Sequence, residues 1–199
     1  RRRSFSSPAA LSLKAMATEQ ARAGSGGLLN LGLIGATPAI SGKGIGVAVI
    51  DSGIASHTAL SGKVIASVNY ATGETTTTDG FGHGTHIAGT IGGNGTGSTG
   101  TYTGVAPGAQ LYDVRVLNDQ GVGNVADVLM GIDWVLQRAR QINIRVMNLS
   151  LGAASTDSFL VDPLARATRS AVANGLVVVV SAGNAGKDAN GREVYGAVS

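Results

Sequence analysis

Three polar residues of this 199-residue chain stand in glycine-rich stretches, where apolar runs end or a helix begins. Asp51 follows the apolar run 45–50, His83 lies in the stretch DGFGHGTH, and Asn184 follows the apolar run 176–180. A carboxylate at the end of a buried strand must be paired or hydrogen-bonded. The glycines around His83 let a backbone or a substrate approach the imidazole, a side chain that exchanges protons near neutral pH. Each residue alone also fits an ordinary turn, cap or core position. A functional prediction therefore requires that the three side chains lie close together in the folded protein.

The pattern of apolar residues predicts the elements that would bring these side chains together. Short β-branched runs indicate buried strands, and residues 125–139 repeat apolar side chains at the helical period, with Asn124 as a candidate N-cap. Apolar strands that alternate with helices indicate a parallel sheet covered on both faces. We therefore expect an α/β fold, a three-layer sandwich with a mostly parallel central sheet and helices on both faces. The expected strands are 45–50, 64–70, 110–117, 145–149 and a fully buried 176–180, and the expected helices are 83–92, 125–139 and 158–174.

The polar residues that follow the expected strands should lie together at one edge of the sheet. Ligand sites in open parallel sheets lie beyond the carboxyl ends of the strands. Asp51, residues 150–152 and residues 181–184 each follow an expected strand directly. His83 opens an expected helix and can lie on the same rim. The sequence therefore predicts one site built from segments that are far apart in the chain.

Composition excludes several classes of protein. Hydrophobic residues make up 43% of the chain and charged residues 14%, which argues against disorder because disordered segments are charged and poor in apolar residues. With no Cys, the chain offers no disulfide, thiol nucleophile or iron–sulfur site. Five of the 15 basic residues lie in the first 22 positions, and no basic face is expected elsewhere, so we predict no nucleic-acid partner. No apolar run approaches the roughly 20 residues of a membrane span.

The two ends of the chain differ from its middle. Residues 1–40 are polar and Gly/Ser-rich in parts, and they contain Arg2-Arg3-Ser4-Phe5 and Ala15-Met16-Ala17, which look like an export motif and a small-residue cleavage site. We expect 1–40 to be a linker or the remnant of a pro- or targeting segment. Residues 41–199 are expected to form a domain that is truncated at its C-terminal end.

Six stretches of the sequence resemble the subtilisin-like serine proteases, or subtilases. The two most specific are VAVIDSGI at 47–54 and DGFGHGTHIAGTIGG at 79–93, which hold Asp51 and His83. Subtilisin has the same order of Asp and His, about 32 residues apart, and the same separation occurs here. The resemblance runs from about residue 42 to 199, and its other stretches are GVAP at 104–107, LYDVRVL at 111–117, MNLSLG at 147–152 and VVSAGNAG at 179–186.

The resemblance implies a role for each matching residue. Asp51 would be the triad carboxylate that orients the imidazole, His83 the general base and then the general acid, and Asn184 an amide donor to the oxyanion. It also implies polypeptide substrates, whose extended backbone would pair with one edge and whose side chain would enter a first specificity pocket. The residues implied for substrate binding are Gly121, Val122, Gly123, Ser150, Leu151, Gly152, Ser181, Ala182 and Gly183.

The serine nucleophile of the family is not found in this sequence. Subtilases carry it in a Gly-Thr-Ser motif about 189 residues after the triad Asp, which places it at about position 240 here. We therefore interpret residues 41–199 as an incomplete subtilase catalytic domain. The source protein is expected to be a serine endopeptidase that works through an Asp/His/Ser triad and an acyl-enzyme, whereas the 199-residue chain alone is expected to be inactive. The alternative is a catalytically dead binding module on the subtilase fold.

No cofactor or metal is expected. The calcium site of many subtilases uses an Asp shortly after the first motif, and residues 57–60 offer no carboxylate, although backbone carbonyls could still bind calcium. A metal hydrolase using Asp79, His83 and His86 lacks an evident third good ligand. The Gly-x-Gly stretch 95–100 follows a helix rather than a strand, so it lacks the context of a nucleotide-binding loop. The family resemblance further implies the protein's own pro-domain as a partner during maturation and a secreted or extracytoplasmic location.

Overall fold

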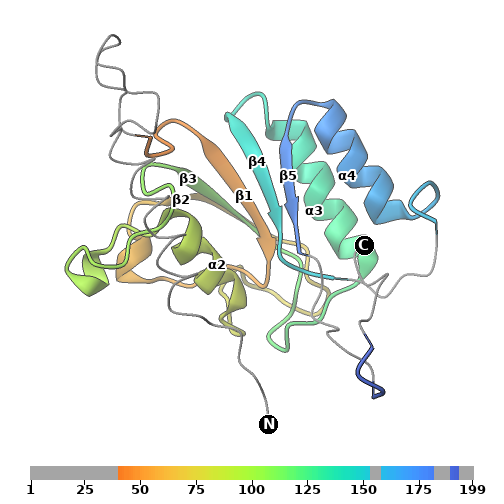
Figure 1. Ribbon diagram of the computed structural model, residues 1–199, viewed down its shortest axis with the longest axis horizontal. Helices are drawn as coiled ribbons and strands as arrows, with labels where there is room; N and C mark the ends of the chain where they lie inside the picture. Colours follow the sequence, from red (N-terminus) through yellow and green to blue (C-terminus); the bar gives the residue numbers. More distant parts are fainter. Residues whose placement is uncertain (1–39, 153–157, 182–188, 193–199) are drawn as a thin grey trace.

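The computed structural model describes residues 40–152, 158–181 and 189–192. Five parallel strands in these ranges form one sheet in the order β2-β3-β1-β4-β5 (Figure 1). The strands are β1 (Gly46–Asp51), β2 (Val64–Asn69), β3 (Gln110–Arg115), β4 (Ile144–Leu149) and β5 (Val177–Val180). The helices are α2 (His83–Gly92), α3 (Val125–Arg138) and α4 (Pro163–Ala173), with short 3₁₀ helices η1 (Thr58–Leu60) and η2 (Thr96–Ser98).

Helices cover both faces of the sheet, which confirms the predicted α/β sandwich with a parallel sheet (Figure 1). On one face, Ala88 of α2 packs with Val49 of β1 and Leu111 of β3. On the other face, α3 and α4 pack over a larger core that includes Ile50 of β1 and Val114 of β3. Because successive side chains of a strand point to opposite faces, β1 and β3 contribute to both cores, and for that reason apolar side chains occur at consecutive positions of these strands.

The register of the sheet sets where its carboxyl ends lie. Asp51 is the last residue of β1 and pairs with Arg115, the last residue of β3. On the other side of β1, Ile50 pairs with Leu149, the last residue of β4. The loops that follow these three strands therefore begin at the same rim, as predicted. Beyond β3 the chain leaves the ladder, and the backbone amides of Val116 and Leu117 both donate to the Asp51 carbonyl, so this strand ends two residues earlier than expected.

Two expectations about the C-terminal elements were wrong. α4 begins at Pro163 rather than at 158, because Asp162 caps the helix with a 2.8 Å bond from the Ala165 amide and Pro suits the first helical turn. β5 is not fully buried: Val177, Val179 and Val180 are 60%, 48% and 44% exposed. β5 lies at the edge of the described sheet, where its only strand neighbour is β4.

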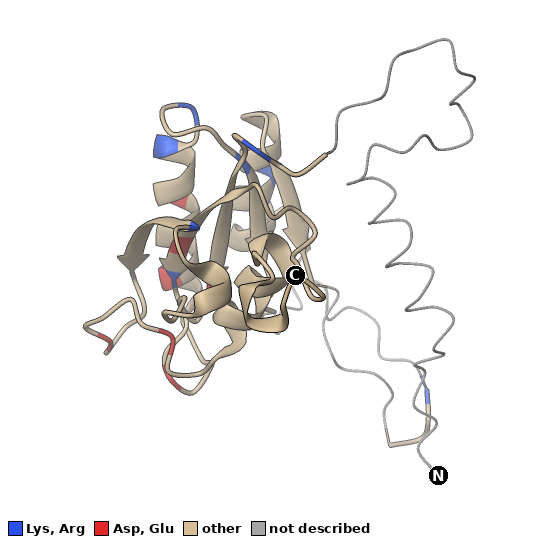
Figure 2. Cartoon of the chain, turned by 90° about the vertical axis from the view of Figure 1, so that its left-hand side faces the viewer, with Lys and Arg blue, Asp and Glu red and all other residues tan. Residues whose placement is uncertain are grey.

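In the view of Figure 2 the Lys and Arg residues lie scattered on separate elements. None of the helices in the described ranges combines the length and the apolarity that crossing a bilayer requires.

Candidate active site

Asp51 and His83 form a hydrogen-bonded pair at the rim of the sheet. The Nδ1 atom of His83 lies 2.8 Å from the Oδ1 atom of Asp51. Asp51 is completely buried, whereas the His83 side chain is 39% exposed. Within the described part of the chain, the Nε2 atom of His83 has no hydrogen-bond partner. An imidazole with one nitrogen tied to a carboxylate and the other free can accept a proton from a bound reactant.

The sequence around His83 places the ring against Asp51. α2 begins at His83, and its N-cap Gly82 has a positive φ of 93°, a conformation that favours glycine. The next residue, Gly84, lies against the loop after β1: a β-carbon there would come within 2.2 Å of the Gly53 carbonyl and 3.1 Å of the Asp51 β-carbon. Only glycine therefore lets the first turn of α2 approach the end of β1 this closely.

Asp79 fixes this approach from the loop that precedes α2. Its Oδ1 atom accepts from the Gly82 amide at 2.7 Å and the Ser52 hydroxyl at 2.9 Å, and its Oδ2 atom accepts from the Thr85 amide and hydroxyl. Burial by itself would raise the pKa of Asp79, but the hydrogen bonds from Thr85, Gly82 and Ser52 outweigh it and hold the pKa below its usual range. The Asp79 carboxylate thus holds the N-terminus of α2 in place through these hydrogen bonds.

Ser52 connects Asp79 to the Asp51–His83 pair. Its amide donates to Asp51 Oδ1 at 2.7 Å, and its hydroxyl accepts from the Gly84 amide at 3.0 Å while lying 2.9 Å from Asp79. Asp51 Oδ1 therefore accepts from Ser52 as well as from His83, while Oδ2 is buried without a hydrogen-bond partner. The hydroxyl of Ser52 is held inside this network, so it has a structural role here.

A second buried carboxylate, Asp113, lies on the same face of the sheet. Its two oxygens are buried without hydrogen-bond partners that meet ordinary geometric limits. Burial raises the pKa of Asp113 to about 7, an effect reinforced by the charge of Asp79 and opposed by the nearby Ser67 side chain, Ile54 amide and Arg115. The Asp113 carboxyl is therefore much harder to ionise than an exposed aspartate.

The segments expected to bind substrate reach the same rim from two sides. Beyond β4 and β5, the Ser181 amide donates to the Leu149 carbonyl at 3.1 Å and the Ser181 hydroxyl to the Leu151 carbonyl at 2.8 Å, which ties 150–152 to the end of β5. On the other side, Gly121 packs on the Phe81 ring, where a β-carbon would come within 2.6 Å. Val122 and Gly123 are exposed. The predicted residues Ala182, Gly183 and Asn184 lie outside the described residues.

A hollow of the described surface lies beside η1. A cavity of about 870 Å³ is lined there by Ile54, His57, Thr58, Ser67 and Asn94, among others, and its lining holds no carboxylate. In the described ranges, no three His, Cys, Asp or Glu side chains gather closely enough to hold a metal ion. Asp79, considered above as a metal ligand, uses both oxygens for hydrogen bonds within the protein.

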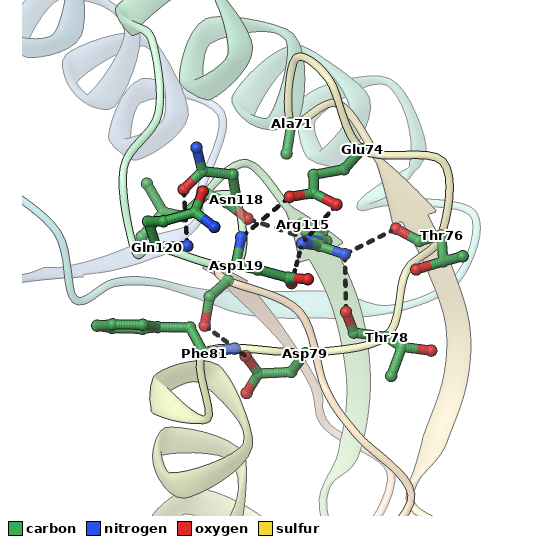
Figure 3. Close-up of polar contacts among 12 residues, drawn as sticks. Ala71, Glu74, Thr76, Thr78, Asp79, Phe81, Arg115, Asn118, Asp119 and Gln120 are labelled. Atoms are coloured by element: carbon green, nitrogen blue, oxygen red, sulfur yellow. Dashed lines mark hydrogen bonds and ion pairs between the residues drawn. The ribbon is translucent and has the colours of Figure 1, made fainter.

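Sequence reasoning missed Arg115 as part of the site. This arginine ends β3 next to Asp51 and is fully buried, with its guanidinium directed into the loops around the rim (Figure 3). A signal was present, because charged residues in a strand otherwise predicted to be buried must have partners. The partners come from the Thr-rich loop 71–78 and from the loop after β3, neither of which has a periodic pattern from which its path could be predicted.

Comparison with known proteins places these features in a family. The family described as "Subtilase family" matches residues 42–198. Serine protease AprX of Bacillus subtilis is 42% identical over 154 residues, covering 75% of this chain and 35% of AprX. Subtilisin DY of Bacillus licheniformis is 43% identical over 148 residues, covering 73% of this chain and 49% of that protein. The chain therefore spans half or less of the length of these relatives.

Two solved structures have a fold similar to that of this chain. A cold-adapted subtilisin-like serine proteinase superposes with a TM-score of 0.60 at 32% identity, covering 75% of this chain and 50% of the other. Sphericase gives a TM-score of 0.63, also at 32% identity, over 74% of this chain and 48% of the other. The chain thus spans about half the length of each of these two structures.

Proposed function

The chain belongs to the subtilase family, and from this premise we propose that it supplies the Asp–His pair of a serine endopeptidase whose nucleophilic serine is carried beyond residue 199. The observation that carries the proposal is the 2.8 Å contact between His83 Nδ1 and the buried Asp51 carboxylate. A neutral His with Nδ1–H donated to Asp51 exposes Nε2 as the proton acceptor. The exposure of His83 and the burial of Asp51 suit these two roles.

In the proposed reaction, His83 Nε2 removes the proton of the serine hydroxyl as the serine oxygen bonds to the peptide carbonyl carbon. Asp51 stabilises the imidazolium that results and does not itself take up the proton. His83 then gives this proton to the departing amine as the C–N bond breaks, leaving an acyl-enzyme. Water, activated by the same imidazole, releases the acid product and regenerates the serine. The Asn184 side chain is proposed to donate to the oxyanion.

Polypeptides are the proposed substrates. An extended peptide would add as a strand along Gly121, Val122 and Gly123, and its side chain at the scissile bond would lie between residues 150–152 and 181–183. Support comes from the position of these segments, because 121–123 and 150–152 approach the Asp–His pair from opposite sides of β1. β3 carries the first segment and β4 the second.

Calcium has no part in this proposal. Many subtilases bind it through an Asp shortly after the first motif, whereas residues 57–60 and the lining of the cavity beside η1 hold no carboxylate, a donor that Ca²⁺ sites commonly use. We also propose that the whole protein matures with the help of its own pro-domain and acts outside the cytoplasm. These two points rest on the family alone.

The proposal is tested by peptide hydrolysis with the full-length protein and its Asp51→Asn variant. The asparagine keeps the shape of the carboxylate but leaves His83 without its anionic partner, so kcat is expected to fall about 10⁴-fold. Asp133→Asn, which removes an exposed carboxylate on α3, is the matched control and should retain full activity. Equal activity of all three proteins, or no hydrolysis by the unchanged one, would refute the proposal.

A further inference from the structure

Arg115 is a buried cation that donates four hydrogen bonds and lies within ion-pair distance of two carboxylates. Its Nε donates to the Leu117 carbonyl at 3.1 Å, and Nη1 donates to the carbonyls of Thr76 and Thr78 at 3.1 and 2.7 Å. Its Nη2 lies 2.7 Å from an Asp119 oxygen and 3.4 Å from a Glu74 oxygen (Figure 3). Because the guanidinium has five N–H donors in a fixed planar fork, these contacts fix the loops after β2 and β3 relative to each other.

Asp119 is the outermost member of this network. Its side chain is 48% exposed, although one of its oxygens accepts from the buried guanidinium. Its backbone amide donates to a Glu74 oxygen at 3.0 Å. Asp119 is therefore attached to the interior through both its backbone and its side chain.

The turn that contains Asp119 is closed internally. The Asn118 amide donates to the Val122 carbonyl at 2.8 Å, and the Gly121 amide donates to the Asn118 carbonyl at 2.9 Å. The Asn118 side-chain oxygen accepts from the amides of Gln120 and Val122, both at 3.0 Å. Residues 118–122 thus form one compact unit, and the attachment at Asp119 sets the position of the whole unit, including the start of the edge 121–123.

This unit lies against the loop that leads into α2. A β-carbon at Gly80 would come within 2.3 Å of the Asp119 carboxylate, and one at Gly121 within 2.6 Å of the Phe81 ring. The Phe81 ring is in turn 6.5 Å from the His83 ring, measured between centroids. The position of the turn therefore sets the distance between the edge 121–123 and His83.

We infer that the ion pair between the buried Arg115 and the half-exposed Asp119 positions the substrate-binding edge 121–123 against the loop that carries His83. The inference rests on the proposed function, which assigns that edge to the substrate backbone. Arg115 and Asp119 are positioning residues in this scheme and touch neither the substrate nor the reacting atoms. Extended peptides, which use the edge, should depend on the pair, while a small ester, which needs only the triad and the oxyanion donors, should not.

The variant for the test is Asp119→Ala in the full-length protein. Changing Arg115 itself would leave buried carbonyls without donors and endanger the fold, whereas the half-exposed Asp119 can be truncated with Arg115 still held by its other partners. Asp133→Ala, an exposed aspartate of α3, is the control for the change in charge. The kcat/KM of each protein is measured with a peptide extended by four residues before the scissile bond and with p-nitrophenyl acetate. Amide hydrogen exchange at residues 120–122 is measured without substrate.

For Asp119→Ala we expect about a tenfold loss of kcat/KM on the extended peptide, equivalent to a tenfold loss of transition-state binding, with less than a twofold change on the ester. Amide exchange at 120–122 should be about tenfold faster, while Asp133→Ala matches the unchanged protein in all readouts. Equal losses on both substrates, or unchanged exchange at 120–122, would overturn the inference with the proposed function intact. An unchanged protein that hydrolyses neither substrate would instead refute the proposed function, and with it the inference.

Discussion

The Gly84 backbone lies so close to the Gly53 carbonyl that a β-carbon at Gly84 would come within 2.2 Å of that oxygen. This contact holds the first turn of α2 against the end of β1, so that His83 reaches Asp51, 32 residues earlier in the chain. The Asp–His pair therefore depends on backbone packing as well as on the two side chains.

Gly84→Ala should be destabilising although alanine is intrinsically the better helix former. We expect a loss of about 2–3 kcal/mol in the free energy of unfolding, because a methyl group meets the backbone of Gly53, which cannot move away easily. Gly89→Ala, in the same helix, is the matched control: its β-carbon would meet nothing within 4 Å. It should stabilise the protein by about 0.5–1 kcal/mol. Urea denaturation of both variants measures the difference, and similar effects at the two positions would contradict the packing argument.

His83→Ala should abolish peptide hydrolysis, with a loss of kcat of about 10⁶-fold, the size seen when a triad His or Ser is removed. The protein should remain folded, because the His83 side chain is 39% exposed and Asp51 keeps the hydrogen bond from the Ser52 amide. His86→Ala is the control, since His86 is an exposed histidine three residues further along α2. Substantial hydrolysis by the His83 variant, or comparable loss in the His86 variant, would remove His83 from its proposed role.

Asp79 should make the protein sensitive to acid. Because the folded-state pKa of Asp79 is held below its usual range, its stabilising effect is present above the unfolded pKa and is lost as the pH falls through the lower folded value. Asp79→Asn is expected to lose about 2 kcal/mol at pH 7, the scale of hydrogen bonds to a charged group. The difference from the unchanged protein should shrink below about pH 4. Denaturation at pH 7 and pH 3 gives the two values, and a difference independent of pH would contradict the role of the charge.

Asp113 should lower the stability of the folded protein as the pH rises, whereas Asp79 lowers it as the pH falls. The folded pKa of Asp113, about 7, lies above the usual 3.8, so the unfolded chain binds fewer protons than the folded one between these values. Stability therefore falls as the pH rises from about 4 to about 7, and the full loss is present above pH 7. Asp113→Asn cannot ionise, so its stability relative to the unchanged protein should rise by about 4 kcal/mol between pH 4 and pH 8. A constant difference across this range would show that Asp113 is not shifted.

The sequence was sufficient to predict the Asp–His pair and the sheet that positions it. Apolar runs that alternate with a helical pattern indicated the parallel sheet, and the rule that sites lie beyond the carboxyl ends of strands selected Asp51. The start of α4 could also have been predicted, since Asp162-Pro163 is a capping residue followed by a proline at the first helical position. The expected burial of β5 was wrong because an apolar run does not reveal whether a strand will lie at an edge.

The partners of Arg115 and Asp79 could not be predicted in the same way. Arg115 interacts with irregular loops, and Asp79 lies in such a loop itself, where hydrogen bonds of individual carbonyls and amides decide the path of the backbone. A single sequence contains no periodicity for such loops, and only the charged residues within the run LYDVRVL indicated that partners must exist. The role of Asn184, which lies outside the described residues, stays a prediction.

Labelling with a fluorophosphonate tests the Asp51–His83 assignment most directly, because this reagent bonds to a serine that is activated by a neighbouring base. The full-length protein and its His83→Ala variant are treated, and the modified residue is located by mass spectrometry. The predicted result is one labelled serine beyond residue 199, with labelling lost in the variant. Labelling that persists without His83, or its absence from a folded unchanged protein, would contradict the proposed serine endopeptidase.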